Sequence, residues 1–223
     1  MNKLVGTLVF TLSAAMSHAG VIDWTDWTDA VEGESATGTV GGVGVAFFGD
    51  VFFAQLADGV MVGGGASATT DYWTEGSPAP YTGNAVVDNR PPGFELIAFN
   101  EDSFNAVVFD SPVLNPVMAI VSQGRLGVPV SYDFDQSFTV LSEGQGFWGD
   151  GTYTHVGNTL TGNELHAVIQ FQGLISEIEW FSTEENWHGF TIGVPQSDAP
   201  EPATLFLLGA GALGVIGSRR RRT

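Results

Sequence analysis

The sequence contains no cysteine among its 223 residues. Disulfide bonds, thiol nucleophiles and thiolate metal sites are therefore all excluded. A protein of this composition that works outside the cytoplasm must hold its fold together by burial alone, or with help from bound ions.

Basic residues are almost as scarce. The stretch 20–199 holds only Arg90 and Arg125 against 24 acidic residues, a net charge of 2 − 24 = −22. Such a surface repels phosphate backbones, so we predict no nucleic-acid partner, and it attracts cations. A hydrophobic content of 43% and an aromatic content of 12% argue against an acidic disordered chain and for a packed core.

Catalytic motifs are also missing. The chain has no G-x-S-x-G elbow, no H-E-x-x-H and no Walker loop. His155, His166 and His188 are spread along the chain, each in or beside an expected strand. Carboxylates are so abundant that some pair will lie at the distance found in glycosidases by chance. That distance therefore does not indicate an active site. We predict that the protein is not an enzyme, and a hydrolase is a less favoured alternative.

The N-terminal residues 1–19 have the pattern of a secretory signal peptide. Lys3 supplies the positive region, residues 4–12 supply the apolar region, and small residues precede the expected cleavage between Ala19 and Gly20. The sequence therefore predicts export and a signal peptidase as a processing partner.

The C-terminal segment 198–223 combines three features in a fixed order: a Pro-Glu-Pro triplet, an uncharged stretch over 203–217 and a cluster of arginines. A helix over that stretch would reach roughly 22 Å, short of the ~30 Å hydrocarbon core of a bilayer. The arginines would hold the end of the chain on the cytoplasmic side. The triplet is Pro200, Glu201 and Pro202, and the basic cluster is Arg219, Arg220, Arg221 and Arg222.

This tail resembles the PEP-CTERM sorting signal of Gram-negative bacteria, a family also called the ice-binding protein C-terminal domain. The resemblance implies export across the inner membrane and anchoring through a short C-terminal hydrophobic helix. It also implies recognition and removal of the tail by an exosortase, and then a location at the cell surface or outside the cell, often in bacteria that make exopolysaccharide. Residues 94–194 resemble a β-sandwich region of other proteins with this tail, to which no activity attaches.

Between the two ends, the dominant pattern is a period of two. Val128, Val130, Tyr132 and Phe134 alternate with Pro129, Ser131, Asp133 and Asp135, and similar short runs recur between turn signals. We predict one all-β domain over 20–197, an antiparallel β-sandwich of jelly-roll type. Its core is expected over 94–194, with a looser part over 20–93. Within that part, 37–70 could supply two or three edge strands, and 75–93 is expected to be a long surface loop, because its prolines disfavour a central strand.

Two sets of residues are candidates for binding. The first set could bind exopolysaccharide and consists of Trp148, Tyr153 and Trp187. Sugars bind to aromatic faces combined with planar polar groups. The alternative is that Trp180 and Trp187 are core residues. Ice binding is less favoured, because the threonines of 152–162 form no extended repeat.

The second set consists of Asp133, Asp135 and Asp150, which follow a strand or lie in a glycine-rich loop. Calcium binds clustered carboxylates of this kind, and it is the one cofactor that the sequence leaves open. The alternative, which we favour, is a solvated acidic face. The function predicted overall is an exported surface or matrix β-sandwich, with carbohydrate binding as the alternative.

Overall fold

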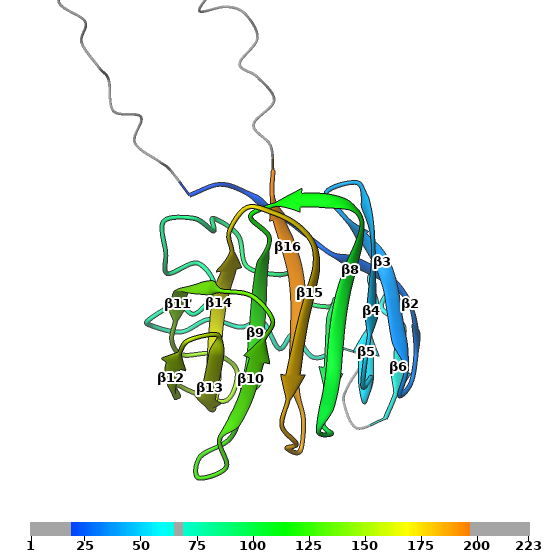
Figure 1. The fold of residues 1–223 in the computed structure, drawn as a ribbon. Helices are drawn as coiled ribbons and strands as arrows, with labels where there is room; N and C mark the ends of the chain where they lie inside the picture. The colour runs from blue at the N-terminus through cyan, green and yellow to red at the C-terminus, as the bar shows by residue number, and fades with distance from the viewer. Residues whose placement is uncertain (1–18, 65–68, 197–223) are drawn as a thin grey trace, which may run out of the picture.

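The computed structural model describes residues 19–64 and 69–196. In this part of the chain sixteen strands and no helix form two antiparallel sheets packed face to face (Figure 1). The antiparallel β-sandwich predicted from the sequence is thereby confirmed. Most of the signal peptide, the sorting tail and the expected C-terminal helix lie outside the described residues.

One sheet exposes its outer face to solvent, and we call it the open sheet. Its strand order is β12-β13-β10-β15-β8-β4-β3-β2. The bounds are β2 Asp26–Val31, β3 Ser35–Val40, β4 Val43–Phe48, β8 Ser103–Leu114, β10 Val130–Phe134, β12 Thr152–Val156, β13 Thr159–Asn163 and β15 Leu174–Ser182.

The other sheet is buried on both faces along its central strands, and we call it the covered sheet. Its order is β11-β14-β9-β16-β7-β5-β6, and β1 pairs with the far part of β16. The bounds are β1 Ile22–Trp24, β5 Phe53–Gln55, β6 Met61–Gly63, β7 Leu96–Phe99, β9 Val117–Gln123, β11 Phe138–Glu143, β14 Leu165–Phe171 and β16 His188–Pro195.

The main core lies between the two sheets and follows the period of two. Along β10, Val130, Tyr132 and Phe134 are buried, whereas Asp133 points to solvent on the other face. At about 25 cal/mol per Å² of apolar surface removed from water, this burial is the dominant stabilising contribution in a chain without disulfides. Val128, which the alternation also includes, lies outside the strand and is exposed.

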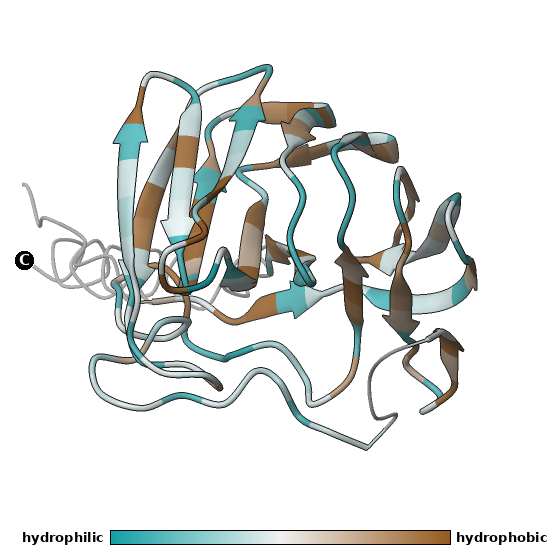
Figure 2. Ribbon diagram, turned by 90° about the horizontal axis from the view of Figure 1, so that it is seen from below, coloured by the Kyte–Doolittle hydropathy of each residue, from teal (hydrophilic) through white to brown (hydrophobic). Residues whose placement is uncertain are grey.

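A long segment without strands, residues 69–95, covers the outer face of the covered sheet, and we call it the covering segment. Tyr72, Trp73 and Tyr81 from this segment pack on Val117 and Ala119 of β9 in a second hydrophobic cluster. Seen from below in Figure 2, the segment forms a third layer along the lower edge of the picture. Strands β9, β14 and β16 are buried almost throughout, because layers pack on both of their faces.

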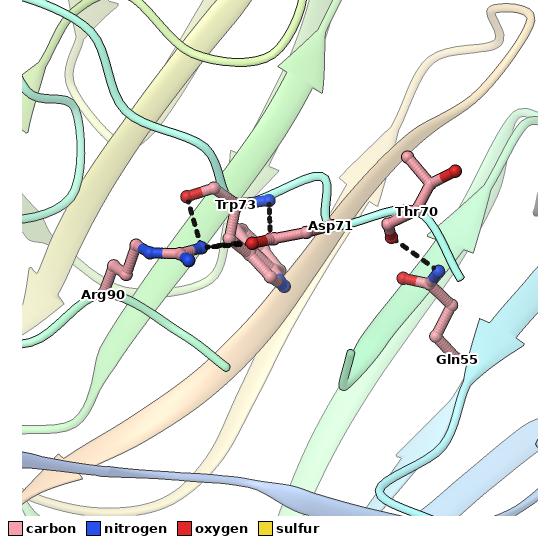
Figure 3. A network of polar contacts seen from close by, with 5 residues as sticks. All are labelled: Gln55, Thr70, Asp71, Trp73 and Arg90. Atoms are coloured by element: carbon pink, nitrogen blue, oxygen red, sulfur yellow. Dashed lines mark hydrogen bonds and ion pairs between the residues drawn. The ribbon is translucent and has the colours of Figure 1, made fainter. Parts of the chain in front are cut away.

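Polar contacts fix the covering segment near its start and near its end (Figure 3). Arg90 donates from one nitrogen, Nη1, to Asp71, 2.8 Å away, and to the carbonyl oxygen of Trp73 at 3.0 Å. Gln55 of β5 donates to the carbonyl oxygen of Thr70 at 3.0 Å. The Gln55 bond ties the segment to the sheet that it covers, and the Arg90 bonds join the two ends of the segment to each other.

The N-terminal half contributes more regular structure than the sequence predicts. The segment 20–63, expected to be loose, forms six strands. The described part of 37–70, expected to supply two or three edge strands, contains β4, β5, β6 and most of β3, and β4 lies inside the open sheet. Trp27 and Phe47 from this segment are fully buried in the main core. Only the covering segment matches the expected long loop.

The two ends of the described sandwich lie side by side. Ile22 pairs with Pro195 across β1 and β16, and the Gln196 N–H donates to the Val21 carbonyl oxygen at 2.9 Å. Gly20 bonds to the covering segment through Val86 and Asp88. Within residues 19–64 and 69–196 there is no helix long and apolar enough to cross a membrane.

Candidate functional site

A tight turn from Gly146 to Gly149, which we call the glycine turn, presents two aromatic side chains at the surface. Gly146 and Gly149 exchange backbone hydrogen bonds of 2.8 and 3.2 Å, which places Phe147 and Trp148 at the tip of the turn. Gly149 has φ +122°, a conformation that glycine adopts readily. A Cβ atom on Gly146 would lie 2.3 Å from Cγ of His166, so the turn rests directly on that buried ring.

The turn meets aromatic residues from two other parts of the chain. Trp148 stacks on Tyr72 of the covering segment, with ring centroids 5.5 Å apart, and meets Trp187 edge to face at 5.0 Å. Trp187 in turn contacts Phe53 of β5. Trp148 remains 44% exposed, whereas Trp187 is partly buried. We call Tyr72, Phe147, Trp148 and Trp187 the aromatic cluster.

Beside this cluster lies a pocket of about 200 Å³, which we call the aromatic pocket. It is smaller than the ~300–1,000 Å³ typical of sites for drug-sized ligands, and it suits one ring or head group of a longer molecule. Its lining combines two tryptophans, an amide, a hydroxyl and three charged groups: Ser122, Arg125, Trp148, Glu164, Glu185, Asn186 and Trp187.

The two carboxyl groups of the pocket lie in an environment that disfavours their ionised forms. Burial, and to a lesser extent nearby Glu164, raise the pKa of Glu185 to about 7, against the opposing effects of Arg125 and the Gly124 N–H. Burial also raises the pKa of Glu164, although its hydrogen bond from the Ser122 hydroxyl, 2.8 Å long, acts in the other direction. Near neutral pH, Glu185 can therefore gain or lose a proton.

A buried histidine supports the floor of this site. His166 is fully buried, its Nδ1 lies 3.3 Å from the Tyr81 hydroxyl, and its Nε2 faces the Glu164 carboxylate at 3.8 Å. Burial lowers the pKa of His166 to about 4, so the ring is neutral at pH 7. It therefore supplies no positive charge to the pocket.

The backbone is unusual at the same place. Ser122 and Glu164 have φ values of +56° and +67°, in the left-handed region that residues other than glycine rarely occupy. The pairing of β9 with β14 is irregular between Leu165 and Ala167. Such strained and bulged positions persist where the surrounding structure enforces them, and they often redirect a side chain toward a site.

The structure brings together two of the three proposed glycan-binding residues. Trp148 and Trp187 are in contact, whereas Tyr153 on β12 lines a separate pocket of about 320 Å³ with Pro129 and Asn163. Trp180, by contrast, is a core residue.

The three proposed calcium ligands are also divided. Asp133 and Asp135 line a pocket of about 450 Å³ on the open sheet with Glu179 and exposed aromatic rings, but Asp150 does not. Within the described ranges no three His, Asp or Glu side chains are grouped as metal ligands.

Sequence patterns alone did not identify Tyr72, Arg125, Glu164 or Glu185 as site residues. Glu185 is two positions from Trp187, and this nearness was the one available signal. Tyr72 lies in the covering segment, whose contact with the glycine turn depends on the tertiary fold.

Comparisons with known proteins identify the tail. Residues 198–222 match the model of the PEP-CTERM protein-sorting motif. No curated protein and no solved structure matches the chain.

Proposed function

Because the chain carries a PEP-CTERM sorting motif and is therefore an exosortase-sorted, exported protein of the Gram-negative surface or exterior, we propose that its sandwich binds carbohydrate through the aromatic pocket and has no enzymatic activity. The observation that carries this proposal is the exposed face of Trp148 beside Trp187, Arg125 and two carboxyl groups. Aromatic faces hold the apolar side of a sugar ring, and charged or amide groups bind its hydroxyls.

The position of the pocket supports this proposal. Trp187 directly precedes β16, and the far end of β16 pairs with β1 and leads toward the sorting motif. Eight strand residues span about 26 Å. A sandwich held at the inner membrane by its tail, or attached at the cell surface after exosortase cleavage near Pro200, would present the pocket at the end remote from its attachment.

The ligand that we propose is exopolysaccharide of the producing cells. The test is a pull-down with that purified polysaccharide, together with a glycan array. Trp148→Ala should reduce binding at least tenfold while the domain still unfolds cooperatively. Phe104→Ala is the matched control, because Phe104 is 82% exposed but lies on the open sheet, outside this pocket.

Equal loss in both variants, or no polysaccharide binding by the native domain, would contradict carbohydrate binding and leave a matrix-scaffold role. The processing proposal has its own test. Mass spectrometry of cell fractions should find forms that begin at Gly20 and forms also shortened near Pro200, and detection of the full-length chain alone would contradict it.

A further inference from the structure

Two carboxyl groups of the aromatic pocket face a single positive side chain. When Glu164 and Glu185 are both ionised, Arg125 leaves the pocket with a net charge of 1 − 2 = −1. Glu164 accepts a hydrogen bond from Ser122. The Glu185 Oε2 atom is buried and has no hydrogen-bond partner among the described residues.

An unpartnered buried carboxylate oxygen raises the free energy of the folded state, because it has lost its hydrogen bonds to water and has formed none within the protein. The fully buried His166 adds a second unsatisfied group, since its Nε2 faces Glu164 but has no hydrogen-bond partner in the described part of the chain. A polar ligand with a positively charged donor would satisfy the carboxylates.

We infer that the pocket selects a carbohydrate with a free, protonated amino group, that is, a hexosamine polymer lacking its N-acetyl groups. This inference rests on the proposed function and adds the class of sugar. The ammonium group lies between Glu185 and Glu164, and the rings of Trp148 and Trp187 flank it. Aromatic rings also attract cations.

The charge of the whole domain favours the same ligand. With a net charge of −22 over residues 20–199, the protein draws a cationic polymer toward it and repels polysaccharides built from uronic acids. The raised pKa of Glu185, about 7, shows that its ionised form lacks stabilisation in the free protein. A bound ammonium group would supply that stabilisation and lower this pKa.

The experiment compares three oligosaccharides of equal length by calorimetric titration of the mature domain. They are a β-1,4-linked glucosamine oligomer, its fully N-acetylated form and the corresponding glucose oligomer. We expect the free amine to bind at least tenfold more tightly than the other two. Glu185→Gln should lower the affinity for the glucosamine oligomer at least tenfold and so abolish its preference over the N-acetylated oligomer.

Glu179→Gln is the matched control, because it makes the same change of charge on the open sheet outside the aromatic pocket. An equal loss in both variants would show non-specific attraction and overturn the inference. Equal affinity for all three sugars would overturn it but leave carbohydrate binding in place. Binding to none of them would also overturn it, while the proposed function is judged separately with the native exopolysaccharide.

Discussion

The rings of Tyr72 and Trp148 are stacked, with planes inclined by only 16° and centroids 5.5 Å apart. One ring belongs to the covering segment and the other to the glycine turn, so two pieces of irregular chain form a common surface. Tyr72 also contacts Trp187 and Phe147. The aromatic cluster therefore depends on the covering segment as much as on the strands beneath it.

Removing this ring should destabilise the domain and open the cluster. Tyr72 is buried, so we expect Tyr72→Ala to lower the free energy of unfolding by about 3–5 kcal/mol, as for other large aromatic truncations. Tyr72→Phe keeps the ring and should cost less than about 1.5 kcal/mol. Urea unfolding followed by tryptophan fluorescence measures both values. A cost for Tyr72→Ala below that of Tyr72→Phe would contradict the packing described.

The packing of the glycine turn on His166 provides a second prediction. In Gly146→Ala the new methyl group would collide with the His166 ring, 2.3 Å away at Cγ, and the turn must move. We expect a loss of about 1–3 kcal/mol of stability, as for other overpacked sites, together with weaker carbohydrate binding. The control is Gly64→Ala, where the added atom has no neighbour within 4 Å among the described residues. Equal stability of the two variants would show that the turn does not rest on His166.

The sequence predicted what depends on local periodicity. Val130, Tyr132 and Phe134 alternate cleanly, because one face of the open sheet meets solvent. In the covered sheet, β9 and β16 are buried on both faces. Their sequences do not identify the covering segment, which packs on the outer face of this sheet. The association of Tyr72 with Trp148, or of Glu164 with Glu185, arises from long-range pairing that no local pattern contains.

Glu95 makes the stability of the domain depend on pH. It is 6% exposed, and burial together with nearby Asp26 raises its pKa from 4.5 to about 8. Between these two pH values the folded state binds more protons than the unfolded state, so stability falls as pH rises. We expect the free energy of unfolding to decline from pH 6.5 to 8, by up to about 1.4 kcal/mol per pH unit for this group.

Two buried histidines act in the opposite direction below pH 6.5. Burial lowers the pKa of His166 to about 4 and of His188 to about 3, so acid favours the unfolded state, which takes up their protons. Glu95 and Glu185 offset this loss down to about pH 4.5. Maximal stability is thus expected between about pH 4.5 and 6.5.

The variant Glu95→Gln separates these contributions. It is permanently neutral, so the decline from pH 6.5 to 8 should shrink to the smaller part contributed by Glu185, while the loss in acid should remain. Thermal melts from pH 4 to 8 provide the measurement, with Glu177→Gln on the exposed side of β15 as the control. An unchanged alkaline slope in Glu95→Gln would assign the decline to other groups.

Arg90 should matter more for local opening than for global stability. Its ion pair with Asp71 is partly exposed, at 40% and 34% for the two side chains, and such pairs contribute about 0.2–1 kcal/mol. We expect Arg90→Ala to change the melting temperature little but to speed proteolytic cleavage within the covering segment. Arg90→Lys keeps the charge, and its cleavage rate should lie between those of the native protein and Arg90→Ala. Equal cleavage rates for all three proteins would show that the segment is held by its buried aromatic residues alone.

The last prediction concerns cations and the large negative charge. Asp133 and Asp135 share a pocket with Glu179, but Asp133 already accepts a hydrogen bond from Thr159 and Asp135 accepts one from the Glu179 N–H. Their carboxylates are thus partly committed within the protein, and Asp150 lies apart. Salt should raise the melting temperature by screening the net charge of −22, and calcium and magnesium at equal ionic strength should act alike. A larger rise with calcium that Asp133→Asn removes would contradict this expectation, because only a native-state site stabilises by mass action.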